Sequence, residues 1–257
     1  MAPLSPEQWH NRYRQQAGWT QQLRRHLFER LDLNHAMRLL EAGCGTGAVL
    51  AEVSAMSAAH SYGLDISFEY LLLARHHAPT ARLAAGDAHC LPYASGSFDL
   101  VCCHYLLLWV KDPAQVVEEL ARITRQGGAV MLMAEPDYGG RIDYPQELES
   151  LAAWQVKSLH KQGADPLIGR RLAGLLAGAG LSQVEGGVLG GAWTGPPASQ
   201  DWEMEWQVLR DDLGRLGQDG STSLVEIDAL QELDRQAWQR GERVLFVPTF
   251  YAWGRKE

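Results

Sequence analysis

A glycine-rich segment, Glu41-Ala42-Gly43-Cys44-Gly45-Thr46-Gly47, is the clearest chemical feature of this 257-residue chain. It follows an apolar run at 37–42 and precedes a helical pattern at 48–57. Glycines let the backbone turn sharply and approach a ligand closely, and the N-terminus of the next helix supplies free N–H groups. The segment therefore predicts a loop that holds a ligand carrying a carboxylate or a phosphate.

Two acids follow this loop at the ends of further expected strands. Asp65 ends the run at 61–65, and Asp87 lies in the segment 85–88 after a short strand. A carboxylate suits a ribose diol, because each of its oxygens can accept one O–H. The pattern Gly43-x-Gly45-x-x-Ala48 with Asp65 also fits the dinucleotide fingerprint, so NAD is a candidate ligand on this motif alone. Glu41 weighs against NAD, because an acid at that position would repel a pyrophosphate.

The elements that must position these residues alternate between strands and helices. The hydrophobic pattern predicts strands at 37–42, 61–65, 81–85, 98–103 and 129–134, and helices at 48–57, 68–77 and 113–124. This alternation favours a parallel α/β sheet whose carboxyl edge faces the ligand. Further helices are expected within 1–33, at 147–161, at 169–179 and, as a pair, within 196–241. Two more strands are expected at 181–189 and 243–253.

Composition and charge narrow the function classes. Lys and Arg number 23 against 31 Asp and Glu, a net charge of −8 that argues against a general nucleic-acid binder. No apolar run is long enough for a transmembrane helix, and residues 1–9 lack the pattern of a secretion signal. The four cysteines lack metal-ligand spacing, which predicts reduced thiols and no metal site. A cytoplasmic location is expected.

The segment from Arg38 to Pro136 resembles the core of class I S-adenosylmethionine-dependent methyltransferases, especially the small-molecule branch that includes ubiquinone-biosynthesis enzymes. The resemblance implies a Rossmann-like sheet of seven mostly parallel strands, with an antiparallel last strand, helices on both faces and a helical lid. The motifs that carry it are Leu40 to Gly47, Gly63-Leu64-Asp65-Ile66-Ser67, Gly86-Asp87-Ala88-x-x-Leu91-Pro92-Tyr93, Ser97-Phe98-Asp99-Leu100-Val101 and Arg125-Gln126-Gly127-Gly128.

The family pattern implies four parts of the chain. Residues 1–35 would be an N-terminal helical lid element, 36–191 the methyltransferase core, 192–242 a helical lid insertion and 243–257 the final strand of the core. The lid would exclude water and hold an organic acceptor, although such aromatic side chains more often form the core of the lid itself. The tryptophans expected near the lid are Trp19, Trp193, Trp202, Trp206 and Trp238.

The resemblance also implies how S-adenosylmethionine would be held. The glycine loop should bind the methionine part, and Glu41 should orient its amino group. Asp65 should accept hydrogen bonds from the ribose, while Asp87 should meet the adenine amino group. The residues expected to bind the cofactor are Tyr13, Arg14, Trp19, Glu41, Gly43, Cys44, Gly45, Gly47, Asp65, Ile66, Asp87, Ala88 and His104.

Methyl transfer from a sulfonium needs mainly alignment, and a base only where the acceptor must lose a proton. The candidate catalytic residues are His104, Glu135, Asp137 and Tyr138. Related enzymes often carry an Asn and then a His after the fourth strand. Here His104 and Leu108 stand at those positions, so a base borrowed from the later His is missing.

The predicted function is therefore methyl transfer to a small organic molecule, with S-adenosylhomocysteine as the product. No nucleic-acid partner is expected. Three alternatives remain open at this point. They are a methyltransferase acting on RNA or protein, an NAD-dependent oxidoreductase, and a non-catalytic protein that binds the cofactor.

Overall fold

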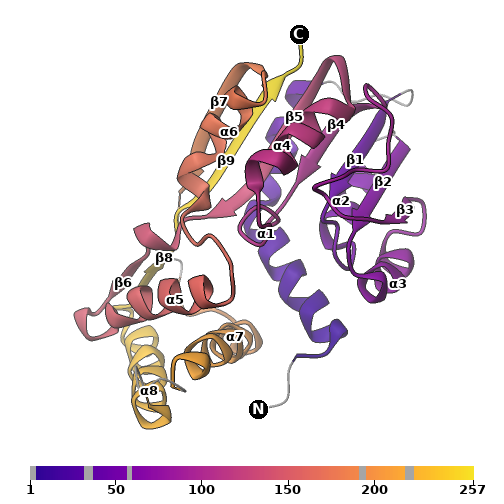
Figure 1. The fold of residues 1–257 in the computed structure, drawn as a ribbon. Coiled ribbons are helices and arrows are strands. Elements are labelled where there is room, and N and C mark those ends of the chain that lie inside the picture. The colour runs from indigo at the N-terminus through magenta and orange to yellow at the C-terminus, as the bar shows by residue number, and fades with distance from the viewer. Residues whose placement is uncertain (1–3, 32–36, 57–59, 191–194, 218–222) are drawn as a thin grey trace.

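A sheet of seven strands in the order β3-β2-β1-β4-β5-β9-β7 forms the centre of the fold (Figure 1). The structure is a computed structural model that describes residues 4–31, 37–56, 60–190, 195–217 and 223–257. The parallel strands are β1 (Arg38–Ala42), β2 (His60–Asp65), β3 (Arg82–Ala85), β4 (Phe98–Cys103) and β5 (Thr124–Pro136). Strand β9 (Thr249–Arg255) runs antiparallel to both β5 and β7 (Ser182–Leu189). The predicted fold class is confirmed.

Helices cover both faces of this sheet. Neighbouring residues of a buried strand point to opposite faces, as Leu39 and Leu40 of β1 do. On the Leu39 side pack α1 (Pro6–Leu31) and α2 (Ala48–Met56), and on the Leu40 side pack α4 (Pro113–Ile123) and α6 (Leu172–Gly178). Helix α3 (Phe68–His77) joins α2 through a smaller cluster around Leu50 and Leu71.

Helix α1 begins as its sequence predicts. The Ser5 hydroxyl accepts from the backbone N–H of Gln8, and the Gln8 side chain accepts from the backbone N–H of Ser5. This reciprocal pair satisfies two donors that a helix start leaves free. Farther along, Leu27 and Phe28 bury against the sheet, so α1 is attached to the main domain.

A group of helices lies beyond one end of the sheet (Figure 1). We call it the helical subdomain. Its apolar core contains Leu148, Leu151, Trp206, Leu209, Leu213 and Ile227. Its elements are β6 (Ile142–Tyr144), η2 (Gln146–Leu148), α5 (Ser150–Lys161), α7 (Ser199–Gly217), α8 (Leu224–Arg240) and β8 (Val244–Phe246), with β6 and β8 paired as a two-stranded ribbon. Two short 3-10 helices lie at its boundaries in the chain. Helix η1 (Tyr138–Gly140) connects β5 to β6, and η3 (Ile168–Arg171) connects α5 to α6.

This grouping differs from the expected parts of the chain in two places. Residues 142–161, expected in the core, belong to the helical subdomain. The strand expected at 243–253 with an interruption at Pro248 forms β8 and β9, and β8 pairs with β6 instead of joining the core sheet. Trp193 lies outside the described residues.

The connections between the sheet and the helical subdomain lie side by side. Pro136 at the end of β5 and Leu189 at the end of β7 both pair with Thr249, the first residue of β9. Three chain connections therefore leave the sheet along one row of strand ends, and a fourth runs from α5 through η3 to α6. In the described ranges, no helix has the length and apolar character needed to cross a membrane.

Tight packing between β4 and β5 gives a test of this sheet. A Cβ on Gly128 of β5 would lie 2.7 Å from the carbonyl oxygen of Asp99 and 2.9 Å from that of Arg125. We expect Gly128→Ala to lower the free energy of unfolding by about 1–3 kcal/mol, because backbone atoms cannot yield easily. Gly174→Ala in α6, where a Cβ meets nothing within 4 Å, should instead raise it by about 0.5–1 kcal/mol. Urea unfolding checks both, and equal effects would contradict the described packing.

Candidate functional site

The glycine loop follows β1 at the carboxyl edge of the sheet. Gly43, Gly45 and Gly47 have φ angles of +70°, +51° and +82°, which side chains rarely adopt. A Cβ at Gly43 would lie 2.7 Å from the Cδ1 atom of Leu106, and one at Gly47 would lie 3.0 Å from the Cα atom of Ala74. Glycine at these two positions therefore lets the loop pack against both the segment after β4 and helix α3.

Asp65 at the end of β2 holds the glycine loop in place. Its Oδ2 accepts from the backbone N–H of Gly45 at 2.7 Å, and its Oδ1 accepts from that of Ser67 at 2.9 Å. Each carboxylate oxygen has a further lone pair, so the group can still accept from a ligand diol. The next residue, Ile66, is 77% exposed, and its side chain is free to cover a flat ligand.

Glu41 is the buried acid behind the loop. It is 2% exposed, and its Oε2 has no hydrogen-bond partner in the described residues. Burial raises the pKa of this carboxyl to about 8, although the charge of Arg24 acts in the opposite direction. Buried polar atoms are nearly always paired. An unpartnered carboxyl oxygen beside a ligand loop therefore fits a group that donates hydrogen bonds, such as an ammonium.

Asp87 lies in the loop that follows β3. Its Oδ1 accepts from the backbone N–H of His89 at 2.9 Å and lies 2.7 Å from the His89 Nδ1. These hydrogen bonds hold the pKa of Asp87 below its usual range. Ala88 is buried in the core under the loop, so the backbone at this point is fixed.

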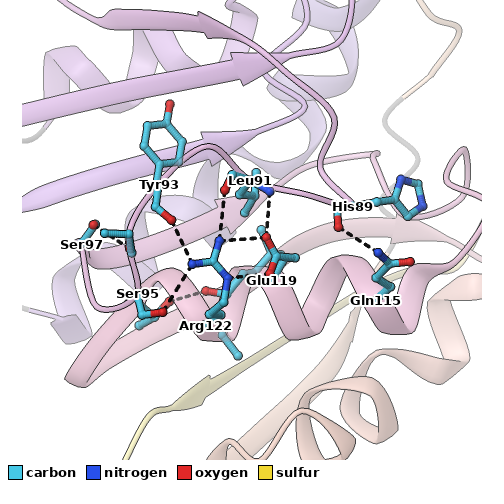
Figure 2. A network of polar contacts seen from close by, with 12 residues as sticks. His89, Leu91, Tyr93, Ser95, Ser97, Gln115, Glu119 and Arg122 are labelled. Atoms are coloured by element: carbon cyan, nitrogen blue, oxygen red, sulfur yellow. Dashed lines mark hydrogen bonds and ion pairs between the residues drawn. The ribbon is translucent and has the colours of Figure 1, made fainter.

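Helix α4 fastens the loop that carries Asp87 (Figure 2). Arg122 donates to the carbonyl oxygens of Leu91 at 3.0 Å and Tyr93 at 2.9 Å, while Glu119 accepts from the Leu91 N–H at 2.7 Å. Gln115 donates to the His89 carbonyl at 3.0 Å. The polar side of α4 therefore satisfies backbone groups of the loop and sets where Asp87 stands.

The three expected cofactor residues of α1 lie in different places. The Tyr13 ring lies against the glycine loop, 3.5 Å from where a Cβ on Gly45 would be. Arg14 is exposed and lines a separate pocket of about 370 Å³ together with His10 and His77. Trp19 lies on the wall of a larger cavity. Tyr13 is thus the one of the three that contacts the loop.

His104 directly follows strand β4 and is buried. Its Nε2 lies 2.8 Å from the hydroxyl of Thr20, which in turn accepts from Arg24 at 2.5 Å. Burial, and then the charge of Arg24, lower the pKa of His104 to about 3. The imidazole is therefore neutral near pH 7 and a weak base.

The two acids expected to be catalytic make internal contacts. The Glu135 carboxylate is fully buried and accepts from the backbone N–H groups of Leu106, Leu107 and Leu108 at 2.9, 2.8 and 3.2 Å. Asp137 forms a two-point ion pair with Arg170 at 2.5 and 2.7 Å. Both acids thereby fix the segments after β4 and β5.

Tyr138 faces a cavity of about 650 Å³ between α1 and the helical subdomain. Thr20 and Tyr105, which flank His104 in space and along the chain, also line it. Sequence reasoning missed Arg12, Tyr105 and Glu205 as site residues, because no local pattern distinguishes them. The aromatic side chains of the cavity wall are Trp19, Tyr105, Tyr138, Trp202, Trp206, Trp238 and Phe246.

Known proteins are similar to the part of this chain that carries the glycine loop, Asp65 and Asp87. Residues 40–132 match the model of a family described as "Methyltransferase domain". This segment is a class I methyltransferase domain. A ubiquinone biosynthesis O-methyltransferase of Aromatoleum aromaticum is 37% identical over 105 residues, 36% of this chain and 42% of that protein. An uncharacterized 37.1 kDa transposon protein of Streptomyces fradiae is 35% identical over 162 residues, 61% of this chain and 46% of that protein.

Solved structures share the fold of the methyltransferase domain and its surroundings. The [4+2]-cyclase SpnF has a TM-score of 0.57 at 19% identity, covering 91% of this chain and 80% of its own. A phosphoethanolamine N-methyltransferase of Haemonchus contortus has a TM-score of 0.55 at 17% identity, covering 88% of this chain and 50% of its own. The chain spans about half or less of the length of the curated relatives it matches.

A phosphoethanolamine N-methyltransferase of Haemonchus contortus that shares this fold was solved in complex with S-adenosyl-L-methionine. The chain's own residues fit this cofactor. The unpartnered Glu41 oxygen suits the ammonium of the methionine part, and the remaining lone pairs of Asp65 suit the ribose hydroxyls. The exposed Ile66 stands beside Asp65, where an adenine ring would need an apolar cover.

The raised pKa of Glu41 predicts how stability depends on pH. Its folded pKa of about 8 exceeds the ordinary value of 4.5, so the folded protein holds a proton that the unfolded chain has lost. This contribution to stability is complete below pH 4.5 and is lost as pH rises through 8, by at most about 1.4 kcal/mol per pH unit. Glu41→Gln should remove this loss, so its advantage over the wild type should grow between pH 5 and pH 8.

Urea unfolding at pH 5, 6.5 and 8 measures this difference. Glu69→Gln, on the exposed side of α3, is the matched control and should follow the wild type at every pH. Parallel curves for Glu41→Gln and the wild type would show that Glu41 is already ionised in the folded protein.

Proposed function

We propose that the protein is an S-adenosylmethionine-dependent methyltransferase that transfers a methyl group to a small organic acceptor held in the 650 Å³ cavity. One observation carries this proposal. The cavity is lined by Thr20 and Tyr105, which flank His104, and it lies at the sheet edge that also bears the glycine loop. Acceptor and cofactor would therefore meet at the end of β4.

The bound cofactor supplies a methyl group on a positively charged sulfur, already activated for displacement. Glu41, the glycine loop and Asp65 bind and orient the cofactor. The neutral His104 places no positive charge beside this end of the site, which suits a sulfonium. The aromatic walls exclude water and align the acceptor, and alignment of this kind can contribute several kcal/mol, up to about 7–11 kcal/mol.

The residues expected to act as a base are poorly suited to remove a proton from the acceptor. His104 is too weak a base, and Glu135 is occupied by three backbone N–H groups. Burial raises the pKa of Tyr138 above its usual range, so Tyr138 acts as a neutral hydroxyl that can hold the acceptor by a hydrogen bond. The acceptor would consequently enter with its attacking atom already free of the proton.

Several observations support a small-molecule acceptor over the alternatives. Relatives named for ubiquinone biosynthesis and malonyl-[acyl-carrier protein] are O-methyltransferases. A cavity of about 650 Å³ with aromatic walls suits a small molecule better than RNA, which needs a basic and accessible surface. A cytoplasmic location is part of the same proposal and is supported by four free thiols.

Calorimetric titration with S-adenosylmethionine, S-adenosylhomocysteine and NAD tests the proposal. We expect the first two to bind and NAD to fail, and a screen of small acceptors should then show methyl transfer. Binding of NAD alone would make the protein an oxidoreductase. Cofactor binding without transfer to any small acceptor would favour a macromolecular acceptor or a non-catalytic role.

Asp65→Asn should weaken S-adenosylhomocysteine binding by about 10- to 100-fold, because hydrogen bonds to a charged group contribute about 1.5–3 kcal/mol. Asp211→Asn, on the exposed side of α7, keeps the same change of charge away from the site and should leave the affinity unchanged. The same titration measures both variants. Equal affinities of the two variants for S-adenosylhomocysteine would show that Asp65 does not bind the cofactor.

A further inference from the structure

An ion pair crosses the acceptor cavity. Arg12 of α1 pairs with Glu205 of α7, and both residues line the cavity. Among the ion pairs of the described residues, this is the one that joins α1 to the helical subdomain. Arg12 is 5% exposed, whereas the Glu205 side chain is 27% exposed and has room to move toward solvent.

Arg12 has hydrogen-bond donors to spare. Its Nη1 alone donates to Glu205 and, at 2.6 Å, to the side chain of Gln15. Within the described residues, Nε and Nη2 donate to no acceptor. These two nitrogens form the side edge of the guanidinium, where two parallel N–H bonds match the two oxygens of a carboxylate.

The other arginines of the cavity are fully engaged. Arg141 directs its three nitrogens at Asp143 and Gln155. Arg243 donates to Asp143, Asp234 and two backbone carbonyls. Each of their nitrogens therefore has an acceptor, so Arg12 is the arginine of this cavity wall that can receive an anion.

The surroundings of Arg12 are flat and aromatic. Its guanidinium lies 5.1 Å from the centre of the Trp19 ring. Trp202 and Trp206 face the same cavity, and their indole N–H groups are already bound to Asp234 at 2.6 and 2.9 Å. These indoles therefore present apolar ring surface to an occupant, together with the hydroxyl of Tyr138.

We infer that Arg12 determines acceptor specificity by binding a carboxylate on a planar aromatic acceptor, through its Nε and Nη2. This rests on the proposed function, since it names the acceptor class for the same cavity. The ring of the acceptor lies between the aromatic walls, and its carboxylate is fixed on α1. Glu205 competes with that carboxylate for Arg12, so Glu205 leaves the pair or shares it when the acceptor is bound.

The test compares two probes that differ in one group, the carboxylate of 4-hydroxycinnamate and the neutral amide of 4-hydroxycinnamamide. Calorimetric titration of the full-length protein should give an affinity at least about tenfold higher for the carboxylate, the scale of a charge-assisted bidentate pair. Arg12→Met should abolish this preference, and Arg12→Lys should keep only part of it, because lysine lacks the planar fork. Equal affinities for the two probes in the wild type, or binding of neither, would overturn the inference.

Glu205→Gln keeps the test decisive should the buried Arg12 variants fold poorly. Removing the competing carboxylate should raise the affinity for 4-hydroxycinnamate several-fold and leave the affinity for 4-hydroxycinnamamide unchanged. An unchanged or weaker affinity for the carboxylate would count against a role for Arg12.

Each titration is run with and without S-adenosylhomocysteine, whose own affinity is measured separately. Arg12→Met should leave that affinity unchanged. Failure of S-adenosylhomocysteine to bind the wild type overturns the proposed function, whereas the charge preference of the cavity is still decided by the two probes alone.

Discussion

The fully buried guanidinium of Arg24 fixes helix α1, and both halves of the site depend on that helix. Arg24 donates to the Thr20 hydroxyl and to the Ala17 carbonyl, and it forms an ion pair with Glu52 of α2. A buried cation that loses its partner is strongly destabilising, so α1 cannot slide or rotate without breaking the ion pair of Arg24 with Glu52. From the fixed helix, Tyr13 reaches the glycine loop and Arg12 reaches the cavity.

Two buried glutamates illustrate how similar residues acquire different roles. Burial raises the pKa of both Glu41 and Glu135 to about 8. Glu135 receives three backbone N–H groups, whereas one oxygen of Glu41 receives none among the described residues. The contacts of Glu135 give it a structural role, because they hold the segment that follows β4. A ligand that donates a hydrogen bond would give this Glu41 oxygen a partner.

The cofactor half could be predicted from sequence because its signals are local. Strand, glycine loop and helix follow one another within 37–57, and the acids at 65 and 87 come directly after strands. The acceptor half depends on residues far apart in the chain. Arg12 and Glu205 meet only through the packing of α1 and α7, and the β6–β8 ribbon pairs short segments separated by about a hundred residues of intervening chain. Glu135 looked catalytic because a strand-end acid gives no sign of which backbone groups it will meet.

The row of strand ends from which three of the connections to the helical subdomain leave has an evolutionary consequence. Pro136, Leu189 and Thr249 lie side by side, so mutations, insertions or exchanges beyond that row leave the pairing of the sheet intact. The match to the methyltransferase family ends at residue 132, just before this row of strand ends begins at Pro136. A lineage can thus acquire a new acceptor by altering α5, α7 and α8 while inheriting its cofactor machinery unchanged. Related proteins with the same sheet would then divide by substrate at this boundary.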